Sequence, residues 1–404
     1  MCGIIGGTRE SFDYEAGIQA LINRGPDNQK LVSGTFSMAF CRLSIIDLHD
    51  RSNQPMHSED NNITIVFNGE IYGFKSLREK LIDNGHIFVT KSDTEVLLKS
   101  YIQWGTKFVD KIDGMFAIAI LDKKINKLFL LRDRPGIKPL YYYFDGKDFA
   151  FSSELKSLEK LVGKKKLKID KSALYDFLTY SYIPCPKSIY LEIKKLPPAH
   201  ILEYDLSINE ISYIEDYWNF HPHEKNNSKI EAVTRKMKKL ISNSIQDQLI
   251  SDVPLGFFLS GGLDSSIVVS VASKLNDKPL QTFTISFRDP NKSEAKYADL
   301  VSKQNGTKHR TIELSSKLAK KLLPNLYNWY DEPNSDTSAI PTFLVSFISK
   351  KYVTVVLTGD GGDEIFGGYR RHKDRHPLSS FFRKDKNRTL NLVKLRDKFK
   401  IKTL

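Results

Sequence analysis

The stretch from Ser251 to Ser266, SDVPLGFFLSGGLDSS, constrains the fold of this chain more than any other. An apolar run of strand length ends at Ser260, two glycines follow, and residues 267–275 have the pattern of a largely buried helix. A strand, a glycine-rich turn and a helix in that order form an anion site, because the first N–H groups of the helix point into the turn. The stretch therefore predicts a phosphate-binding loop.

One carboxylate, Asp264, lies inside the predicted loop, where it would repel a phosphate unless a divalent cation lay between them. Ser260, Ser265 and Ser266 add hydroxyl donors. The loop is not a Walker A motif, since neither GKS nor GKT follows the glycines. An ordinary turn between strand and helix is the alternative, because Gly and Ser are common in such turns. The charge pattern favours a Mg²⁺–polyphosphate ligand.

A second glycine-rich acidic turn, TGDGGDEIFGGY, begins at Thr358, directly after an apolar segment over 353–357. We expect strands over 281–287 and 353–357 and a helix over 338–350, an alternation typical of a parallel sheet. Open sheets of this kind bind ligands at the carboxyl ends of their strands. Asp363 is therefore expected to share the cation with Asp264.

The amino terminus reads MCGIIGG. Cys2 is small enough for Met1 to be removed, which leaves a thiol and a free α-amine on the same residue. An α-amine has a pKa near 8 and can take the thiol proton, so Cys2 is a candidate nucleophile. A disordered terminus is the alternative, although Ile4 and Ile5 indicate a short strand that would bury the end of the chain.

Two further segments carry groups suited to an amino-acid substrate. Arg42 lies on a predicted strand, AFCRLSIID, where its guanidinium could hold a carboxylate through two N–H groups. A strand over 63–67 is predicted to end in Asn68, Gly69 and Glu70. An Asn amide and a Gly N–H at a strand end are suitable oxyanion donors.

The segment SDTE at 92–95 predicts the start of a helix that continues through Trp104. Asp93 could pair there with a substrate ammonium, although helix capping alone explains Ser92 or Asp93. A second helix is predicted over 230–249, where apolar residues recur at helical spacing, and we expect it to pack against the sheet of a second domain.

The motifs MCGIIGG, RGPD, RLSIID, FNGEIY, SDTEVLL, GMFA and RDRPGIKPLYY together resemble the glutaminase domain of class II glutamine amidotransferases. RLSIID, RDRPGIKPLYY and GDGGDEIFGGY look like those of asparagine synthetases, and SGGLDSS resembles the loop of ATP pyrophosphatases. The resemblance implies an α+β and α/β chain of two domains. An αββα sandwich of the N-terminal-nucleophile hydrolases would cover 2–205, with a connecting segment to about residue 228. A parallel-sheet ATP pyrophosphatase domain would cover 229–404.

The resemblance also implies roles for single residues. Cys2 would attack the glutamine amide, with Asn68 and Gly69 stabilising the oxyanion, while Arg42, Glu70 and Asp93 complete the glutamine site. For ATP, the implied contacts are Phe258, Ser260, Gly261, Gly262, Asp264, Ser265, Ser266, Ile285, Thr358 and Gly359, and the implied Mg²⁺ ligands are Asp264 and Asp363.

The implied reaction uses glutamine, ATP and aspartate and yields asparagine, AMP and pyrophosphate. A different carboxylate acceptor, such as a sugar acid in polysaccharide synthesis, stays open, as does a remnant that only hydrolyses glutamine or binds a partner. Other class II amidotransferases are disfavoured by the two phosphate-loop motifs and the lack of a phosphoribosyl-binding signature. An RNA-modifying pyrophosphatase rests only on the loop and on the basic end of the chain.

The net charge of +13 is concentrated at one end, since residues 370–404 carry ten of these charges. No nucleic-acid-binding motif accompanies them, so we expect a solvated segment and no nucleic-acid partner. Three cysteines without metal-ligand spacing, no signal sequence and no long apolar run indicate a cytoplasmic protein without membrane contact, and a homodimer stays open. Synthetases of this family continue further and carry a lysine-containing motif there. The chain is thus expected to be a C-terminally shortened member that makes little or no asparagine.

Overall fold

The computed structural model describes residues 1–9, 11–220, 228–289 and 293–369. The chain divides into two compact units. Unit 1 comprises Met1–Leu255 and Glu313–Val355, and unit 2 comprises Gly256–Ile312 and Val356–Leu404. The two units differ from the predicted domains, since residues 229–255 and 313–355 belong to unit 1. The division into units does not test the domain boundary predicted near residue 228, which stays a prediction. The basic segment 370–404 lies outside the described residues.

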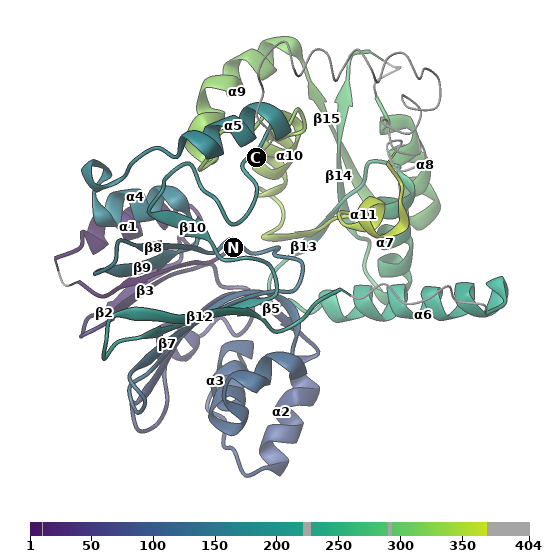
Figure 1. The fold of residues 1–404 in the computed structure, drawn as a ribbon. Helices are drawn as coiled ribbons and strands as arrows, with labels where there is room; N and C mark the ends of the chain where they lie inside the picture. Colours follow the sequence, from purple (N-terminus) through teal and green to yellow (C-terminus); the bar gives the residue numbers. More distant parts are fainter. Residues whose placement is uncertain (10, 221–227, 290–292, 370–404) are drawn as a thin grey trace. The chain divides into compact units, whose positions relative to one another are not determined.

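Two six-stranded sheets form the centre of unit 1 (Figure 1). The first has the order β10-β8-β9-β1-β3-β2 and the second β12-β11-β7-β6-β5-β4, with every neighbouring pair antiparallel. The strands are β1 (Gly3–Gly7), β2 (Asn28–Val32), β3 (Ser37–Arg42), β4 (Met56–His57), β5 (Ile63–Tyr72), β6 (Asp113–Asp122), β7 (Lys127–Arg132), β8 (Tyr141–Phe144), β9 (Phe149–Ser152), β10 (Ile193–Lys195), β11 (His200–Asp205) and β12 (Glu210–Asp216).

Helices cover the outer face of each sheet (Figure 1). They are α1 (Tyr14–Leu21) and α4 (Leu155–Val162) on the first sheet, and α2 (Phe74–Asp83) and α3 (Asp93–Trp104) on the second. Strand β5 shows why the layers form. Ile65 and Phe67 enter the core beneath α2 and α3, whereas Val66 enters the core between the sheets, because successive side chains of a strand point to opposite faces. The predicted αββα sandwich is confirmed.

Unit 1 also contains α5 (Lys171–Tyr180), α6 (Ile230–Gln248), α9 (Ser316–Trp329) and α10 (Ala339–Ser349), and the short 3₁₀ helices Asp50–Ser52, Gly105–Lys111 and Lys164–Lys166. Helical spacing predicted α6 correctly, but only Ile245 of it is buried, and Met237 and Leu240 are exposed. The packing expected for this helix against the sheet of the second domain stays a prediction, because the helix belongs to unit 1 and most of that sheet to unit 2.

Unit 2 is built on a sheet of order β15-β14-β13-β16. Its strands are β13 (Leu255–Phe258), β14 (Gln281–Phe287), β15 (Lys308–Leu314) and β16 (Val355–Leu357), and its helices are α7 (Leu263–Leu275), α8 (Ala295–Asn305) and α11 (Gly362–Phe366). Strands β13 and β14 are parallel. The expected α/β domain is confirmed. Among the described residues, no helix combines the length and the apolar character needed to cross a bilayer.

Candidate active sites

Cys2 lies directly before β1, the strand that pairs with both β3 and β9 in the middle of the first sheet. Two neighbours fix it. Arg24 donates from Nε to the Cys2 carbonyl at 2.9 Å. The Leu43 N–H lies 3.4 Å from Sγ, and the thiol can donate to the Leu43 carbonyl at 3.5 Å. The thiol is thus held at a defined position at the N-terminal end of β1.

Burial shifts the proton equilibria at this end of the chain. It raises the pKa of the Cys2 thiol, which favours the protonated form. Burial also lowers the pKa of the Met1 α-amine to about 6. Removal of Met1 would free a different atom, the nitrogen of Cys2, which is a peptide nitrogen here and lies in similarly buried surroundings. An amine with such a pKa is neutral at pH 7 and can accept a proton, as a base for the thiol requires.

Asn68 lies in the middle of β5, because this strand continues to Tyr72, so the predicted strand end at Asn68 is wrong. The alternation continues past that point through Ile71. Asn68 shares its face with Val66, between the two sheets. Its side chain is fully buried, and within the described part of the chain neither Nδ2 nor Oδ1 has a hydrogen-bond partner. Such an amide is costly unless a ligand satisfies it, because burial removes its water.

Gly69 follows Asn68 in β5, and its backbone N–H is the second candidate oxyanion donor. The Phe67 N–H donates to Gln54 Oε1 at 2.6 Å, and the Ile71 N–H donates to Asp93 Oδ2 at 3.2 Å. Alternate N–H groups of a strand point to the same side, so the Gly69 N–H is directed to the edge between those two groups. A Cβ on Gly69 would lie 2.1 Å from the Met115 carbonyl oxygen, so only glycine permits this approach of β5 and β6.

Asp93 is the first residue of α3, and Ser92 caps the helix by accepting the N–H of Glu95. The Asp93 carboxylate is buried. Burial, followed by the charge of Glu70, raises the pKa of Asp93 to about 7. Burial also raises the pKa of Glu70, which the charge of Lys138 lowers in part. A buried carboxyl group with a raised pKa fits a ligand that brings a positive charge.

Arg42 is buried at the end of β3, and both terminal nitrogens of its guanidinium are already engaged. One donates to the His49 carbonyl and to Asn53 Oδ1, at 3.1 and 2.6 Å. The other donates to the carbonyls of Asp47 and Ile46, at 2.6 and 3.4 Å. A bidentate contact with a substrate carboxylate would therefore require some of these acceptors to be exchanged.

Sequence reasoning missed Glu154, which lies directly before α4 and forms an ion pair with Arg24 at 3.0 Å. The Arg24 guanidinium bridges the Cys2 carbonyl and the Glu154 carboxylate. No local pattern marks Glu154 as part of a site, because its partner is 130 residues away in the sequence.

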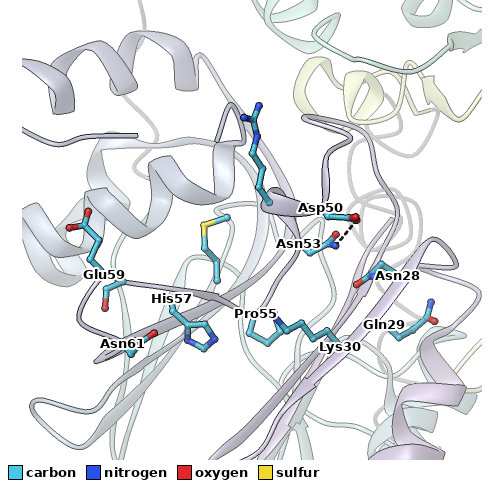
Figure 2. Close-up of a pocket in the computed structure, with 12 residues that line it drawn as sticks. Asn28, Gln29, Lys30, Asp50, Asn53, Pro55, His57, Glu59 and Asn61 are labelled. Carbon is cyan, nitrogen blue, oxygen red and sulfur yellow. Dashed lines mark hydrogen bonds between the residues drawn. The ribbon is translucent and has the colours of Figure 1, made fainter. Parts of the chain in front are cut away.

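An open cavity of about 550 Å³ lies beside the loop that holds Arg42 (Figure 2). Asn53 lines it and is joined to Asp50 by a hydrogen bond of 3.1 Å. None of the residues predicted for the glutamine site lines this cavity. The full lining is Asn28, Gln29, Lys30, Asp50, Arg51, Asn53, Pro55, Met56, His57, Ser58, Glu59 and Asn61.

In unit 2, the turn between β13 and α7 is held by its own hydroxyl groups. Ser260 Oγ accepts the Gly262 N–H at 3.1 Å and lies 3.0 Å from Ser265 Oγ. Ser266 Oγ donates to the Gly262 carbonyl at 2.6 Å. Gly262, the N-cap of the 13-residue helix α7, has no side chain to cap it. Within the described residues, the first N–H groups of this helix are thus without a side-chain acceptor, as an anion site requires.

The two glycine-rich turns are in contact. A Cβ on Gly359 would lie 2.6 Å from the Ser265 nitrogen, and one on Gly362 would lie 2.5 Å from Asp264 Cγ. Burial and then the charges of Asp363 and Glu364 raise the pKa of Asp264. Carboxylates that repel one another fit a cation between them. Among the described residues, however, no group of three or more His, Cys, Asp or Glu side chains is arranged to hold a metal ion by itself.

The strand register places the remaining predicted ATP contacts near this point. Phe258 pairs with Phe283, and the Leu259 N–H donates to the Phe283 carbonyl at 2.9 Å. Ile285 is two residues further along β14, so it lies at the same edge of the sheet as Ser260. Thr358 and Gly359 follow β16, which neighbours β13 in the sheet.

Two family descriptions match the chain: a glutamine amidotransferase domain over residues 1–218 and asparagine synthase over residues 236–402. A provisionally named asparagine synthetase (glutamine-hydrolysing) 2 of Methanocaldococcus jannaschii is 37% identical, and the match covers 95% of this chain and 80% of that protein. Asparagine synthetase (glutamine-hydrolysing) 1 of Bacillus subtilis is 35% identical, with 95% of this chain and 61% of that protein covered. Glutamine phosphoribosylpyrophosphate amidotransferase from B. subtilis is a structural match with a TM-score of only 0.43 at 13% identity, covering 82% of this chain and 94% of that one.

Proposed function

Since this chain belongs to the family of glutamine-hydrolysing asparagine synthetases, we propose that it moves the amide nitrogen of glutamine onto a carboxylate that ATP has activated. The proposed acceptor is aspartate. The buried amide of Asn68, which has no hydrogen-bond partner among the described residues, is the observation that carries the glutamine half of the proposal. Such an amide fits a ligand that both accepts and donates a hydrogen bond. The glutamine side-chain amide has both capacities.

In the proposed glutaminase reaction, the α-amine of Cys2 takes the thiol proton. The thiolate then attacks the side-chain carbonyl carbon of glutamine. Asn68 Nδ2 and the Gly69 N–H donate to the oxygen that becomes negatively charged. When the tetrahedral intermediate collapses, its C–N bond breaks, and the amine returns its proton so that ammonia leaves. Water then hydrolyses the thioester to glutamate and restores the thiol.

We assign the α-ammonium of glutamine to Asp93, with Glu70 nearby, and the α-carboxylate to Arg42. Asp93 accepts the α-ammonium, which matches the raised pKa of its carboxyl group in the free protein. Glu70, which acts electrostatically on Asp93, adds negative charge to the same region. Arg42 binds the α-carboxylate in exchange for its longer loop contacts, those with the carbonyls of Ile46 and His49.

In the proposed synthetase reaction, an oxygen of the acceptor carboxylate attacks the α-phosphorus of ATP and pyrophosphate leaves. Ammonia then attacks the acyl carbon of the adenylate, and AMP leaves as the amide forms. The turn from Ser260 to Ser266 and the N-terminus of α7 bind the pyrophosphate portion, while Phe258, Ile285, Thr358 and Gly359 contact the nucleotide. Asp264 and Asp363 would hold Mg²⁺ against the phosphates, and the ion would neutralise charge on the leaving group.

Two experiments test this function on the full chain. Purified protein should release glutamate from glutamine, and Cys2→Ala should abolish that release, whereas Cys185→Ala, at an exposed cysteine, should not. Glutamate release that persists in Cys2→Ala would refute the assignment of the nucleophile.

The second experiment identifies the acceptor. With ammonia, ATP and Mg²⁺ supplied, AMP formation that depends on aspartate and yields asparagine would support aspartate as the acceptor. AMP formation that responds to sugar acids but not to aspartate would instead support the amidotransferase with a different acceptor. Glutamate release without acceptor-dependent AMP formation would support a protein with glutaminase activity only.

A further inference from the structure

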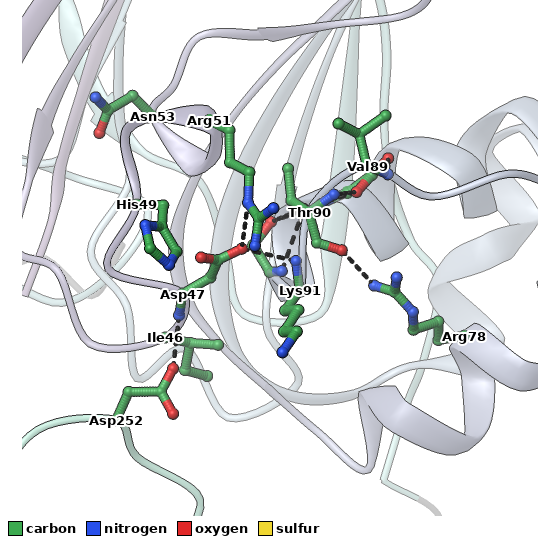
Figure 3. A network of polar contacts seen from close by, with 12 residues as sticks. Ile46, Asp47, His49, Arg51, Asn53, Arg78, Val89, Thr90, Lys91 and Asp252 are labelled. Carbon is green, nitrogen blue, oxygen red and sulfur yellow. Dashed lines mark hydrogen bonds and ion pairs between the residues drawn. The ribbon is translucent and has the colours of Figure 1, made fainter.

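Asp47 joins three segments of unit 1 that are far apart in the sequence (Figure 3). It is buried in the loop after β3 and has a positive φ of 48°. Its carboxylate accepts the Lys91 N–H at 2.7 Å, and the Arg51 guanidinium lies 3.5 Å away. Although burial alone would raise the pKa of Asp47, the N–H donors and Arg51 lower it overall, so the carboxylate is charged. Asp47 thus fixes the chain immediately ahead of Ser92 and Asp93.

The backbone of Asp47 makes two more contacts. Its carbonyl accepts from Arg42 at 2.6 Å, and its N–H donates to the carboxylate of Asp252 at 2.8 Å. The Asp252 N–H in turn donates to the Ile45 carbonyl at 3.0 Å. Asp252 therefore holds the loop that contains Asp47 through two hydrogen bonds, one to its carboxylate and one from its N–H. Three residues after Asp252 the chain enters β13, which leads into the SGGLDSS turn.

These contacts connect the two residues assigned to the α-carboxylate and the α-ammonium of glutamine. Arg42 is held by the Asp47 carbonyl, and Asp93 begins its helix two residues after Lys91, which the Asp47 carboxylate holds. The spacing between a carboxylate-binding guanidinium and an ammonium-binding carboxylate selects an α-amino acid of the correct geometry. A small shift of either group weakens both contacts at once.

We propose that Asp47 is a positioning residue for glutamine binding and that Asp252 holds it in place, so that the segment ahead of the SGGLDSS turn contributes to glutamine affinity. This inference rests on the proposed function of Arg42 and Asp93. It assigns no chemistry to Asp47 or Asp252 themselves, since neither is assigned a contact with the reacting atoms.

Substitutions at Asp47 can distinguish the effect of its carboxylate from the effect of its backbone conformation. Asp47→Gly removes the carboxylate but accepts the positive φ, whereas Asp47→Asn keeps an acceptor oxygen and also tolerates that conformation. Glutamine binding is measured by calorimetry in a Cys2→Ala background, which removes hydrolysis from the measurement. Loss of a buried hydrogen bond to a charged group predicts a Kd about tenfold higher or more for Asp47→Gly, and a Kd within about threefold of the parent for Asp47→Asn.

Asp252 is tested in the same way. Asp252→Ala should raise the Kd of glutamine about three- to tenfold, Asp252→Asn should restore most of the affinity, and the exposed Asp247→Asn serves as the matched control. In the Cys2-containing protein, alkylation of Cys2 by iodoacetamide should proceed at the parental rate in every variant, because this reagent has neither an α-carboxylate nor an α-ammonium.

The outcomes are distinct. An unchanged glutamine Kd in both Asp47→Gly and Asp252→Ala would overturn the inference and leave the glutaminase assignment intact. Slower Cys2 alkylation in parallel with weaker binding would also overturn it, since the substitutions would then have damaged the site in general. Absence of glutamine binding by the Cys2→Ala parent would refute the proposed function and the inference together.

Discussion

The carboxylate of Asp331 accepts the backbone N–H of Leu155 at 2.7 Å, although 176 residues separate the two in the sequence. It thereby caps the N-terminus of α4, the helix that Glu154 directly precedes. Lys156 links the same groups, since its ammonium lies 2.7 Å from Glu154 and 3.7 Å from Asp331. Glu154 pairs with Arg24, and Arg24 holds the Cys2 carbonyl. A continuous set of polar contacts thus runs from Asp331 to Cys2 within unit 1.

The first prediction concerns the charge of Asp331. Burial, and then the charge of Glu154, raises the pKa of Asp331 to about 6. In the unfolded chain this pKa is about 4. The folded protein therefore binds the proton more tightly, and the ionised group reduces stability increasingly from about pH 4 to pH 6, by at most about 3 kcal/mol above that range. Asp331→Asn keeps an acceptor for the Leu155 N–H and removes this charge.

The change in melting temperature caused by Asp331→Asn should accordingly be more favourable at pH 8 than at pH 5. Thermal unfolding of the variant and the parent at both values measures this, with the exposed Asp83→Asn as control. If Asp331→Asn changed the melting temperature by the same amount at pH 5 and pH 8, the pKa of the Asp331 carboxyl group would not be raised by burial.

Asn68 should show opposite effects on activity and stability. Asn68→Ala removes an oxyanion donor and should lower kcat for glutamine hydrolysis by about 10²–10³. It also removes two buried polar atoms that have no hydrogen-bond partner in the part of the chain that the structure describes, so the melting temperature should stay the same or rise. Steady-state kinetics and thermal unfolding test the two parts. A clear loss of stability would show that the amide is satisfied within the protein.

Glutamine affinity should depend on the protonation of Asp93. With a pKa of about 7 in the free protein, this carboxyl group is mostly protonated at pH 6 and mostly ionised at pH 8. An ammonium binds the ionised form, so affinity should fall as the pH decreases from 8 to 6, and binding at pH 6 should release protons. Calorimetry in buffers of different ionisation enthalpy measures that release. Asp93→Asn should bind weakly at both pH values, and a parental affinity that does not change with pH would contradict the assignment.

Gly359→Ala should disable ATP binding but not glutamine hydrolysis. The added Cβ would lie 2.6 Å from the Ser265 nitrogen, so the turns around Ser265 and Gly359 must separate. The shift in melting temperature that Mg²⁺–ATP causes in the parent protein should be lost in this variant, while glutamate release from glutamine continues. Gly306→Ala is a control for the substitution itself, because a Cβ there meets no atom within 4 Å, although its positive φ strains it. Retention of the ATP-induced shift in Gly359→Ala would argue against the predicted site.

The sequence predicted those parts of the fold that local pattern determines. Strand β14 has the predicted bounds, and α3 begins at the predicted cap, because apolar alternation and a capping residue act over a few residues. Asn68 was placed at a strand end because a polar N-G-E run resembles a turn, and the pairing with β6 that extends the strand is not visible locally. Neither Asp252 nor Asp331 carries a signal for its partner. Their contacts join residues 205 and 176 positions apart, which only the folded chain brings together.

The buried start of the chain at Cys2 has a consequence for anyone who produces this protein. An affinity tag that is retained ahead of Cys2 would keep the Cys2 nitrogen as a peptide amide, which is not basic. The reaction proposed for Cys2 would then lose its proton acceptor, even though every side chain of the site is present. A tagged protein would therefore fold and bind nucleotide but would not hydrolyse glutamine. The affinity tag should be fused at another position or be removed by cleavage directly before Cys2.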